Sequence, residues 1–172
     1  MYLQYTLNSL YFIALNNSKS ILNLAKIVIK EQSKAVVGLI PQLDSDFEKV
    51  IFWAHESLGR LILTGVGKSA IIGMKITATL NSTGTKSIFM HAADAIHGDL
   101  GMVDKNDIVI CLSKSGNSTE IKTLVPIVKN RGNKLIGMTA NPGSYLGKNS
   151  DALLHVDIAC EACLLYTSDA AD

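Results

Sequence analysis

The sequence predicts an α/β fold: a three-layer α/β/α sandwich around a five-stranded parallel sheet of the flavodoxin-like type, preceded by a helical hairpin. One observation behind this prediction is that short apolar runs alternate with helical patterns about every 20 to 30 residues, which indicates crossovers between parallel strands. Another is that runs such as Asp107–Leu112 are nearly apolar throughout, as strands covered on both faces are. A length of 172 residues with 48% hydrophobic residues suits one domain with a full core.

Two helices are expected before the sheet. Apolar residues recur at helical spacing through residues 21–43, where Pro41 ends the pattern. Ser45–Glu48 has the form of a capping box and is expected to begin a second helix that reaches residue 56. Residues 1–20 are rich in apolar side chains but lack the charged start and the cleavage site of a signal peptide. We therefore expect either a loosely attached extension or upstream sequence that was never part of the natural domain.

Five strands and their connecting helices follow. The expected strands are residues 60–64, 86–90, 107–112, 134–139 and 152–157. Helices are expected at 70–80, at 121–131 and, as a short segment, after Asn141-Pro142-Gly143-Ser144. Residues 91–101 are compatible with helix but are interrupted by glycines. No closing helix follows the fifth strand, so the chain is expected to be cut short, with residues 164–172 as a tail foreign to the domain.

Composition narrows the class of partner. The net charge of +1 and the scattered lysines give no basic face, so nucleic acid is not expected as a partner. No apolar run is long enough to span a membrane. The odd number of cysteines (Cys111, Cys160 and Cys163) fits a reducing, cytoplasmic setting. Cys160 and Cys163 form a C-x-x-C without the second pair that a zinc site needs, so buried thiols are expected.

The segment from Ser113 to Glu120 follows a buried strand and leads into a helix, which makes it a strand-to-helix turn. It combines a glycine with several hydroxyl side chains beside the free N–H groups of a helix start, and α/β proteins bind anions at such turns. We therefore expect a phosphate site here. A plainer alternative is that Asn117–Glu120 is a capping box in which Glu120 only caps the helix, and both roles are compatible.

A second glycine turn, Gly65–Ser69, follows an earlier strand. It matches the loose dinucleotide fingerprint, but the next strand ends in Phe89-Met90-His91, without the acidic residue that a ribose would need. It fails as a Walker A motif because Ile62 stands where a glycine is required. What remains is a turn that offers Lys68 and Ser69 to an anion, or a turn with a solvated lysine.

Several other side chains are candidates for chemistry. His91 and His97 lie in the glycine-interrupted segment at the same edge of the sheet, where a functional role and polar packing both remain open, with His91 also a candidate metal ligand. Glu161, just after the last strand, is a further carboxylate near this edge. Packing or surface positions are expected for Trp53, His55 and His155.

Five motifs, in this order, carry a family resemblance: Thr64–Ser69, Ser82–Thr85, Ala95–Met102, Ser113–Glu120 and Glu161–Cys163. Together they resemble the sugar isomerase (SIS) domain of arabinose-5-phosphate isomerases, and the resemblance covers roughly residues 21–163. It implies interconversion of D-arabinose 5-phosphate and D-ribulose 5-phosphate through a cis-enediol, an early step toward the Kdo sugar of lipopolysaccharide. A homo-oligomer, expected to be a tetramer, with active sites shared between subunits is implied as well, and no cofactor is required.

The resemblance also implies roles for residues at matching positions. The catalytic positions are Lys68, His97, Glu120 and Glu161. Either glutamate is open as the base, while Lys68 would stabilise the enediolate and His97 would assist proton transfer at an oxygen. His91 matches a position that binds a divalent metal. Contacts to the sugar phosphate are implied for Gly67, Ser69, Gly84, Thr85, Ser113, Ser115, Gly116, Ser118 and Thr119.

Beyond Cys163 the sequence departs from the family, which continues with another helix, a Ser-His-Pro-Gly-Gly motif and, in most members, two CBS domains. Residues 164–172 match none of this, which leaves open whether the chain is active as written. Two other functions also remain open. One is a non-catalytic sugar-phosphate-binding module of a regulator, against which the lack of a helix-turn-helix in residues 1–60 argues. The other is an isomerase of a different sugar phosphate.

Overall fold

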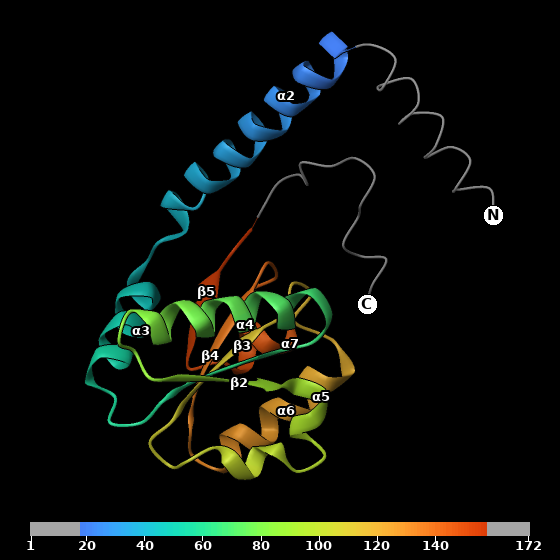
Figure 1. The fold of residues 1–172 in the computed structure, drawn as a ribbon. Coiled ribbons are helices and arrows are strands. Elements are labelled where there is room, and N and C mark those ends of the chain that lie inside the picture. The colour runs from blue at the N-terminus through green and yellow to red at the C-terminus, as the bar shows by residue number, and fades with distance from the viewer. Residues whose placement is uncertain (1–17, 158–172) are drawn as a thin grey trace, which may run out of the picture. The chain divides into compact units, whose positions relative to one another are not determined.

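The computed structural model describes residues 18–157, which fall into two units (Figure 1). The smaller unit includes the helix α2 (Ser18–Val37), which exposes large apolar side chains such as Ile27 and Ile29. This helix ends at Val37, before Pro41, which was expected to end it, and Pro41 lies in a short 3-10 turn, η1 (Ile40–Gln42). The larger unit, residues 41–157, holds the sheet.

The sheet has five parallel strands in the order β2-β1-β3-β4-β5, which confirms the predicted flavodoxin-like topology. The strands are β1 (Leu61–Gly65), β2 (Ser87–His91), β3 (Ile108–Leu112), β4 (Lys134–Thr139) and β5 (Ala152–His155). Strands β1 and β3 are buried at every position, as their unbroken apolar sequences predict.

Helices cover both faces of this sheet and make the predicted three layers. On one face lie α3 (Ser45–Glu56) and α4 (Gly67–Ser82). The other face carries α5 (Ala92–Ala95), η2 (Asp99–Met102), α6 (Thr119–Asn130) and α7 (Tyr145–Asn149). Alternate residues of β1 point into the two cores: Leu63 packs with Val50 of α3, and Ile62 packs with Leu124 of α6.

The start of α3 corrects one prediction. Ser45–Glu48 is not a capping box, because the residue before it, Asp44, is the N-cap and its carboxylate accepts hydrogen bonds from the N–H groups of Asp46 and Phe47. The side chain of Asp46 instead accepts a hydrogen bond from the N–H of Leu153 in β5, at 2.8 Å. The helix bounds are as predicted, and the capping residue is not.

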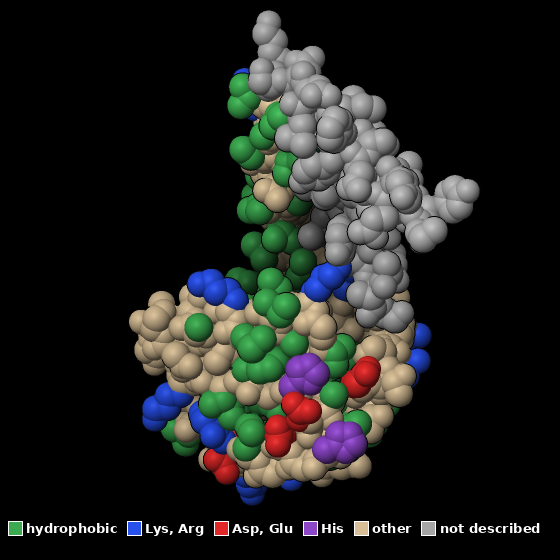
Figure 2. Space-filling model, turned by 45° about the vertical axis from the view of Figure 1, so that its right-hand side comes forward, with side chains coloured by type: hydrophobic (Ala, Val, Ile, Leu, Met, Phe, Trp, Pro, Cys, Tyr) green, Lys and Arg blue, Asp and Glu red, His purple; other side chains and the backbone are tan. Residues whose placement is uncertain are grey.

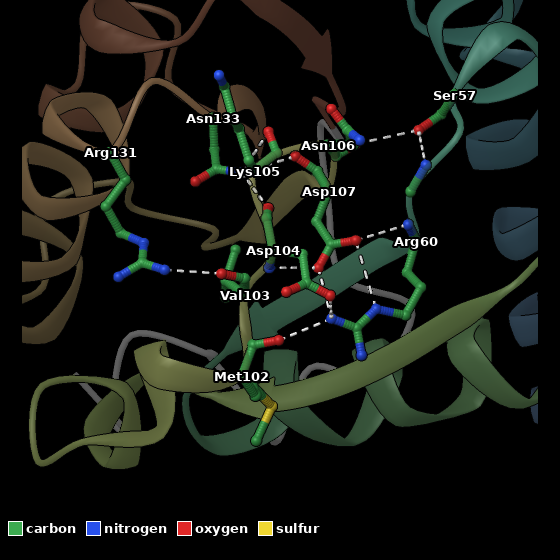
Figure 3. A network of polar contacts seen from close by, with 11 residues as sticks. Ser57, Arg60, Met102, Val103, Asp104, Lys105, Asn106, Asp107, Arg131 and Asn133 are labelled. Carbon is green, nitrogen blue, oxygen red and sulfur yellow. Dashed lines mark hydrogen bonds and ion pairs between the residues drawn. The ribbon is translucent and has the colours of Figure 1, made fainter.

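A network of polar contacts joins the amino ends of the strands (Figure 3). Asp107, whose side chain is 1% exposed, accepts hydrogen bonds from the backbone N–H and the guanidinium of Arg60 and from the N–H of Asp104. Asn133 donates to the carbonyls of Asp104 and Asp107, at 2.8 and 2.9 Å. The starts of β1 and β3 are thereby tied to the turn that precedes β4.

Within residues 18–157, no helix combines the length and the hydrophobicity that crossing a bilayer requires.

Candidate functional site

The strand order creates a topological switch point at the carboxyl edge of the sheet, where open α/β sheets form a ligand crevice. The chain leaves β1 toward β2 on one side and returns to form β3 on the other, so β1 and β3 are neighbours whose crossovers diverge. Ligands of open α/β sheets bind outside the carboxyl ends of strands at such a switch point. Both anion-binding turns predicted from the sequence, after Gly65 and after Leu112, lie here, because these two residues are register partners.

The turn after β1 exposes the start of a long helix. Val66 is the N-cap of α4 and provides no side-chain hydrogen bond, so the N–H groups of the first turn are not capped by it. Gly67 adopts a positive φ of 54°, which favours glycine. Lys68 is exposed and Ser69 is half-buried. An uncapped start of a 16-residue helix beside a lysine suits an anion.

The turn after β3 uses some of its hydroxyls to hold its own shape. Ser113 is buried, and its Oγ accepts the N–H of Gly116 at 3.0 Å. The Oγ of Ser115 accepts the N–H of Asn117 at 3.3 Å. The Oγ of Ser118, at the N-cap of α6, is buried without a hydrogen-bond partner among the described residues. Because a buried polar atom is normally paired, a ligand at this helix start would supply the partner that the Ser118 hydroxyl lacks among these residues. Thr119, the next residue, is exposed.

The capping-box interpretation of this turn is wrong. The N-cap of α6 is Ser118 rather than Asn117, and no side-chain cap bond is found at this helix start within the described chain. The side-chain oxygen of Asn117 accepts the N–H of Tyr145 instead, at 2.9 Å. Glu120 lies half-buried in the first turn of α6, so it is not committed to capping.

A group of supporting residues behind the turn was not predicted from the sequence. The carbonyl of Lys114 accepts hydrogen bonds from Thr139 Oγ1 and from the N–H of Ala140, at the end of β4. The carbonyl of Gly116 accepts the N–H of Leu146 in α7. The break at residues 141–144 was visible in the sequence, but nothing in it indicated that this break would bring α7 against the turn after β3.

His91 and His97 occupy different environments. The Nδ1 atom of His91 accepts the N–H of Ala93 at 3.3 Å, so this histidine caps α5, and its ring meets that of Phe89 edge-on. Asp94 Oδ2 lies 4.0 Å from the same nitrogen. No group of three potential metal ligands occurs among residues 18–157, and a metal at His91 stays a prediction. His97 is exposed after α5.

Two predicted substrate contacts lie away from the crevice. Gly84 and Thr85 connect α4 to β2, so they are at the amino edge of the sheet, opposite the turns. Gly84 has a φ of 92°, which accounts for a glycine there without any ligand. Glu161, Cys160 and Cys163 lie outside the described residues, as do residues 1–17 and the predicted tail 164–172.

Cys111 is part of the core rather than of the site. Its side chain is fully buried in β3, and burial raises the pKa of its thiol to about 12. A thiol held in its neutral form is a poor nucleophile and a poor metal ligand. The expectation of a buried, structural cysteine is therefore confirmed for this residue.

Comparison with known proteins identifies the family. The model of the SIS domain matches residues 56–169, about two thirds of the chain. The chain belongs to the SIS domain family. The five strands and both turns described above lie within the residues that the SIS model matches.

Individual relatives sharpen this assignment. The chain is 48% identical over 136 residues to the arabinose 5-phosphate isomerase KpsF of Escherichia coli O6:H1, and 44% identical over 141 residues to KdsD of Pseudomonas aeruginosa. These matches cover 78% and 82% of the chain but only 42% and 43% of the relatives, so this SIS chain spans less than half of their length. A solved E. coli structure in complex with arabinose 5-phosphate is 39% identical with a TM-score of 0.81, covering 87% of this chain and 79% of that one.

Proposed function

We propose that the chain is the catalytic domain of an arabinose-5-phosphate isomerase. It would interconvert D-arabinose 5-phosphate and D-ribulose 5-phosphate, early in the synthesis of Kdo and lipopolysaccharide. The observation that carries this proposal is the pair of helix starts at the β1/β3 switch point, one of which leaves the buried hydroxyl of Ser118 without a partner among the described residues. The relatives that bear the name of this activity, at 44 to 48% identity, support the same substrate.

In this proposal the turns hold the phosphate. Two helix starts direct partial positive charge at one crevice, so a dianionic phosphate is stabilised without a metal. Ser118 would donate its hydroxyl, while Ser113 and Ser115 keep the turn in shape, as their present hydrogen bonds do. The backbone around Gly67 would approach the phosphate closely, because no side chain stands there and the described residues leave the space beside it open. Gly116 would contribute its backbone to the same site, with Ser144 packed against its other side.

The chemistry proposed for the sugar is a proton shuttle. A carboxylate, Glu120 or Glu161, removes the proton from the carbon beside the carbonyl, while the carbonyl oxygen gains a proton assisted by His97. The resulting cis-enediol, or its enediolate stabilised by Lys68, takes the proton back on the neighbouring carbon and releases one from its hydroxyl. Atoms and charge balance over the cycle, so no oxidant, reductant or cofactor is needed.

A divalent metal is not part of this proposed cycle. A metal at this position would have His91 and Asp94 as candidate ligands, because Asp94 Oδ2 lies 4.0 Å from His91 Nδ1. That nitrogen already caps α5. Further ligands would have to come from elsewhere. We expect EDTA to leave turnover unchanged, and a loss of activity that added metal restores would contradict this part of the proposal.

The proposal includes a cytoplasmic homo-tetramer with shared sites. α4 exposes Ile71 and Ile72 by 61% and 54%, and Figure 2 shows apolar side chains gathered on one face near histidine and acidic side chains. Surfaces of this kind commonly mark interfaces. Because Gly84 and Thr85 lie across the sheet from the turns, they would contact the substrate of a neighbouring subunit. Mixing Glu120→Gln subunits with Thr85→Ala subunits should then restore part of the activity that each lacks alone.

The deciding experiment is a coupled assay that offers ribulose 5-phosphate, fructose 6-phosphate and sedoheptulose 7-phosphate, accompanied by thermal-shift binding of the same compounds. We expect binding and turnover of the pentose phosphate only. Turnover of only a hexose or heptulose phosphate would contradict the substrate assignment. Tight binding of a sugar phosphate without turnover, in the chain extended to the length of its relatives, would favour the non-catalytic module.

A further inference from the structure

A groove of about 450 Å³ lies at the amino edge of the sheet, across from the phosphate turns. Its walls come from α3, from the connection between α6 and β4, and from the residue that precedes β5. The charged side chains that line it are three lysines, Lys49, Lys129 and Lys134, against one carboxylate, Asp151. Lys129 pairs with Asp151, and Lys49 lies 3.8 Å from a carboxylate oxygen of Asp46, so among the described residues the uncompensated positive charge of the groove rests on Lys134. The chain as a whole is nearly neutral.

The indole of Trp53 lines this groove, and two of the three lysine ammonium groups lie over its ring. The ammonium of Lys49 lies 4.7 Å from the centre of the ring, and that of Lys134 lies 4.6 Å from it. Cation–π contacts hold both ammonium groups in place over the ring. The Lys49 ammonium also donates to the carbonyl of Asp151 and lies 3.8 Å from a carboxylate oxygen of Asp46. Lys134 forms no ion pair among the described residues, so an anion over the ring would meet an uncompensated cation there.

The single carboxylate of the groove is already engaged. One oxygen of Asp151 pairs with the ammonium of Lys129 and the other accepts the N–H of Leu135 at 2.8 Å. Burial raises the pKa of Asp151, but the hydrogen bonds from Lys129 and Leu135 outweigh burial and hold it below its ordinary value. Asp151 therefore stays ionised, and its ion pair holds Lys129 in the wall of the groove. It forms no ion pair with Lys134, the neighbouring described lysine.

We propose that this groove binds an anion that carries two or more linked phosphate groups, such as a nucleoside di- or triphosphate or inorganic polyphosphate. Ammonium groups that come from separate elements can contact an anion whose charge is spread over several ångströms. A single carboxylate is too small to reach all of them. The groove and the phosphate turns lie at opposite edges of the sheet, so this ligand and a sugar phosphate would bind together without competing. The proposal does not rest on the isomerase activity.

Trp53 provides the readout, because it is the single tryptophan of the chain and the proposed ligand draws cations away from its ring. Inorganic tripolyphosphate should change its emission in a saturable manner, with orthophosphate far weaker. Pyrophosphate and ADP distinguish an inorganic polyphosphate ligand from a nucleotide. Equal affinity indicates that phosphates alone are bound, and tighter binding of ADP indicates that the base contributes. Calorimetry supplies the same constants without the indole. The absence of saturable binding of tripolyphosphate and ADP would overturn the proposal.

Matched variants locate the binding. Lys134→Gln should weaken tripolyphosphate binding about tenfold, the effect of losing one charged contact. Lys86→Gln, at the same edge but beside β2, should leave it unchanged, and equal losses in both variants would mean a diffuse charge effect and overturn the site. Ser115→Ala should keep the full response. A response abolished by Ser115→Ala would place the anion at the phosphate turn and overturn the proposal.

Discussion

At the scale of single residues, the hydroxyl of Ser118, unpaired within the described chain, is the feature that most directly tests the proposed phosphate site. Its hydroxyl is buried and has no partner among the described residues, so removing it costs the folded protein no hydrogen bond within them. We expect Ser118→Ala to raise the KM for the sugar phosphate about tenfold, as the loss of one hydrogen bond to a charged group does, with little change in kcat.

The matched control is Ser33→Ala in α2, where the hydroxyl donates to the carbonyl of Ile29. That variant should keep the wild-type KM. Steady-state kinetics and a melting curve for both variants check the prediction. A lowered melting temperature in Ser118→Ala with an unchanged KM would show that the hydroxyl serves the fold and not the ligand.

Glu120 is tested by removing its charge while keeping its shape. It lies half-buried at the first turn of α6 and is not occupied by capping, so Glu120→Gln should leave stability nearly unchanged. If Glu120 is the base, kcat should fall by roughly 100-fold or more, because general base catalysis contributes that much. Glu48→Gln, an exposed carboxylate of α3, is the control. Retained turnover in Glu120→Gln would assign the base to Glu161.

At the scale of elements, the turn between β3 and α6 has a shape that only glycine allows at its centre. Gly116 has a φ of 67°, and a Cβ placed on it would overlap the hydroxyl oxygen of Ser144. We expect Gly116→Ala to cost about 2 kcal/mol in the free energy of unfolding and to raise KM, because the turn must move away from α7.

Gly101→Ala is the comparison for this change. Gly101 lies in η2, and a Cβ there meets nothing within 4 Å, so its stability should stay within about 0.5 kcal/mol of wild type. Urea unfolding measures both variants. Equal stability of Gly116→Ala and Gly101→Ala would mean that the turn is loose enough to accept a side chain, against the close packing on Ser144.

Elements are easier to predict from the sequence than their ends and contacts. The run Lys134–Thr139 is apolar enough that β4 has the predicted bounds. The predicted caps are misplaced because several residues near each helix start, such as Asp44 and Ser45, are equally good N-caps by type. Asn117 is expected in a local cap, but its partner is Tyr145 in a different helix, and local patterns carry no information about such a contact.

At the scale of the whole molecule, the ion pair between Arg60 and Asp107 ties stability to pH. Burial raises the pKa of Asp107, but its hydrogen bonds with Arg60 and Asp104 outweigh burial and hold that pKa below the ordinary value. The carboxylate therefore contributes stability that is fully present above the pKa of an unfolded aspartate, about 3.9, and is lost as the pH falls through the folded-state pKa.

Asp107→Asn is expected to lower the free energy of unfolding by about 2 kcal/mol at neutral pH, because the buried side chain loses its charge and part of its accepting capacity. The difference from wild type should shrink as the pH is lowered below about 4. Urea titrations from neutral to acidic pH measure it. A gap that stays constant over this range would mean that shape, and not charge, explains the loss.

The site could be predicted only in part, because local sequence patterns indicate turns but not contacts between distant segments. Both turns were predicted from glycines and hydroxyls near strand ends, and the parallel topology brings them to one crevice. The topology places Gly84 and Thr85 across the sheet from the turns, whereas the resemblance implied that they contact the substrate. A contact made by a second copy of the chain is part of the proposed oligomer. A single sequence does not show contacts between copies.

The strand order also matters while the chain is being made. β1 pairs with β2 after one intervening helix, but its other neighbour, β3, is synthesised much later. Arg60 and Asp107, which flank the starts of β1 and β3, stand 47 positions apart. At roughly 5 to 20 residues per second, the ribosome leaves one edge of an apolar strand unpaired for a few seconds.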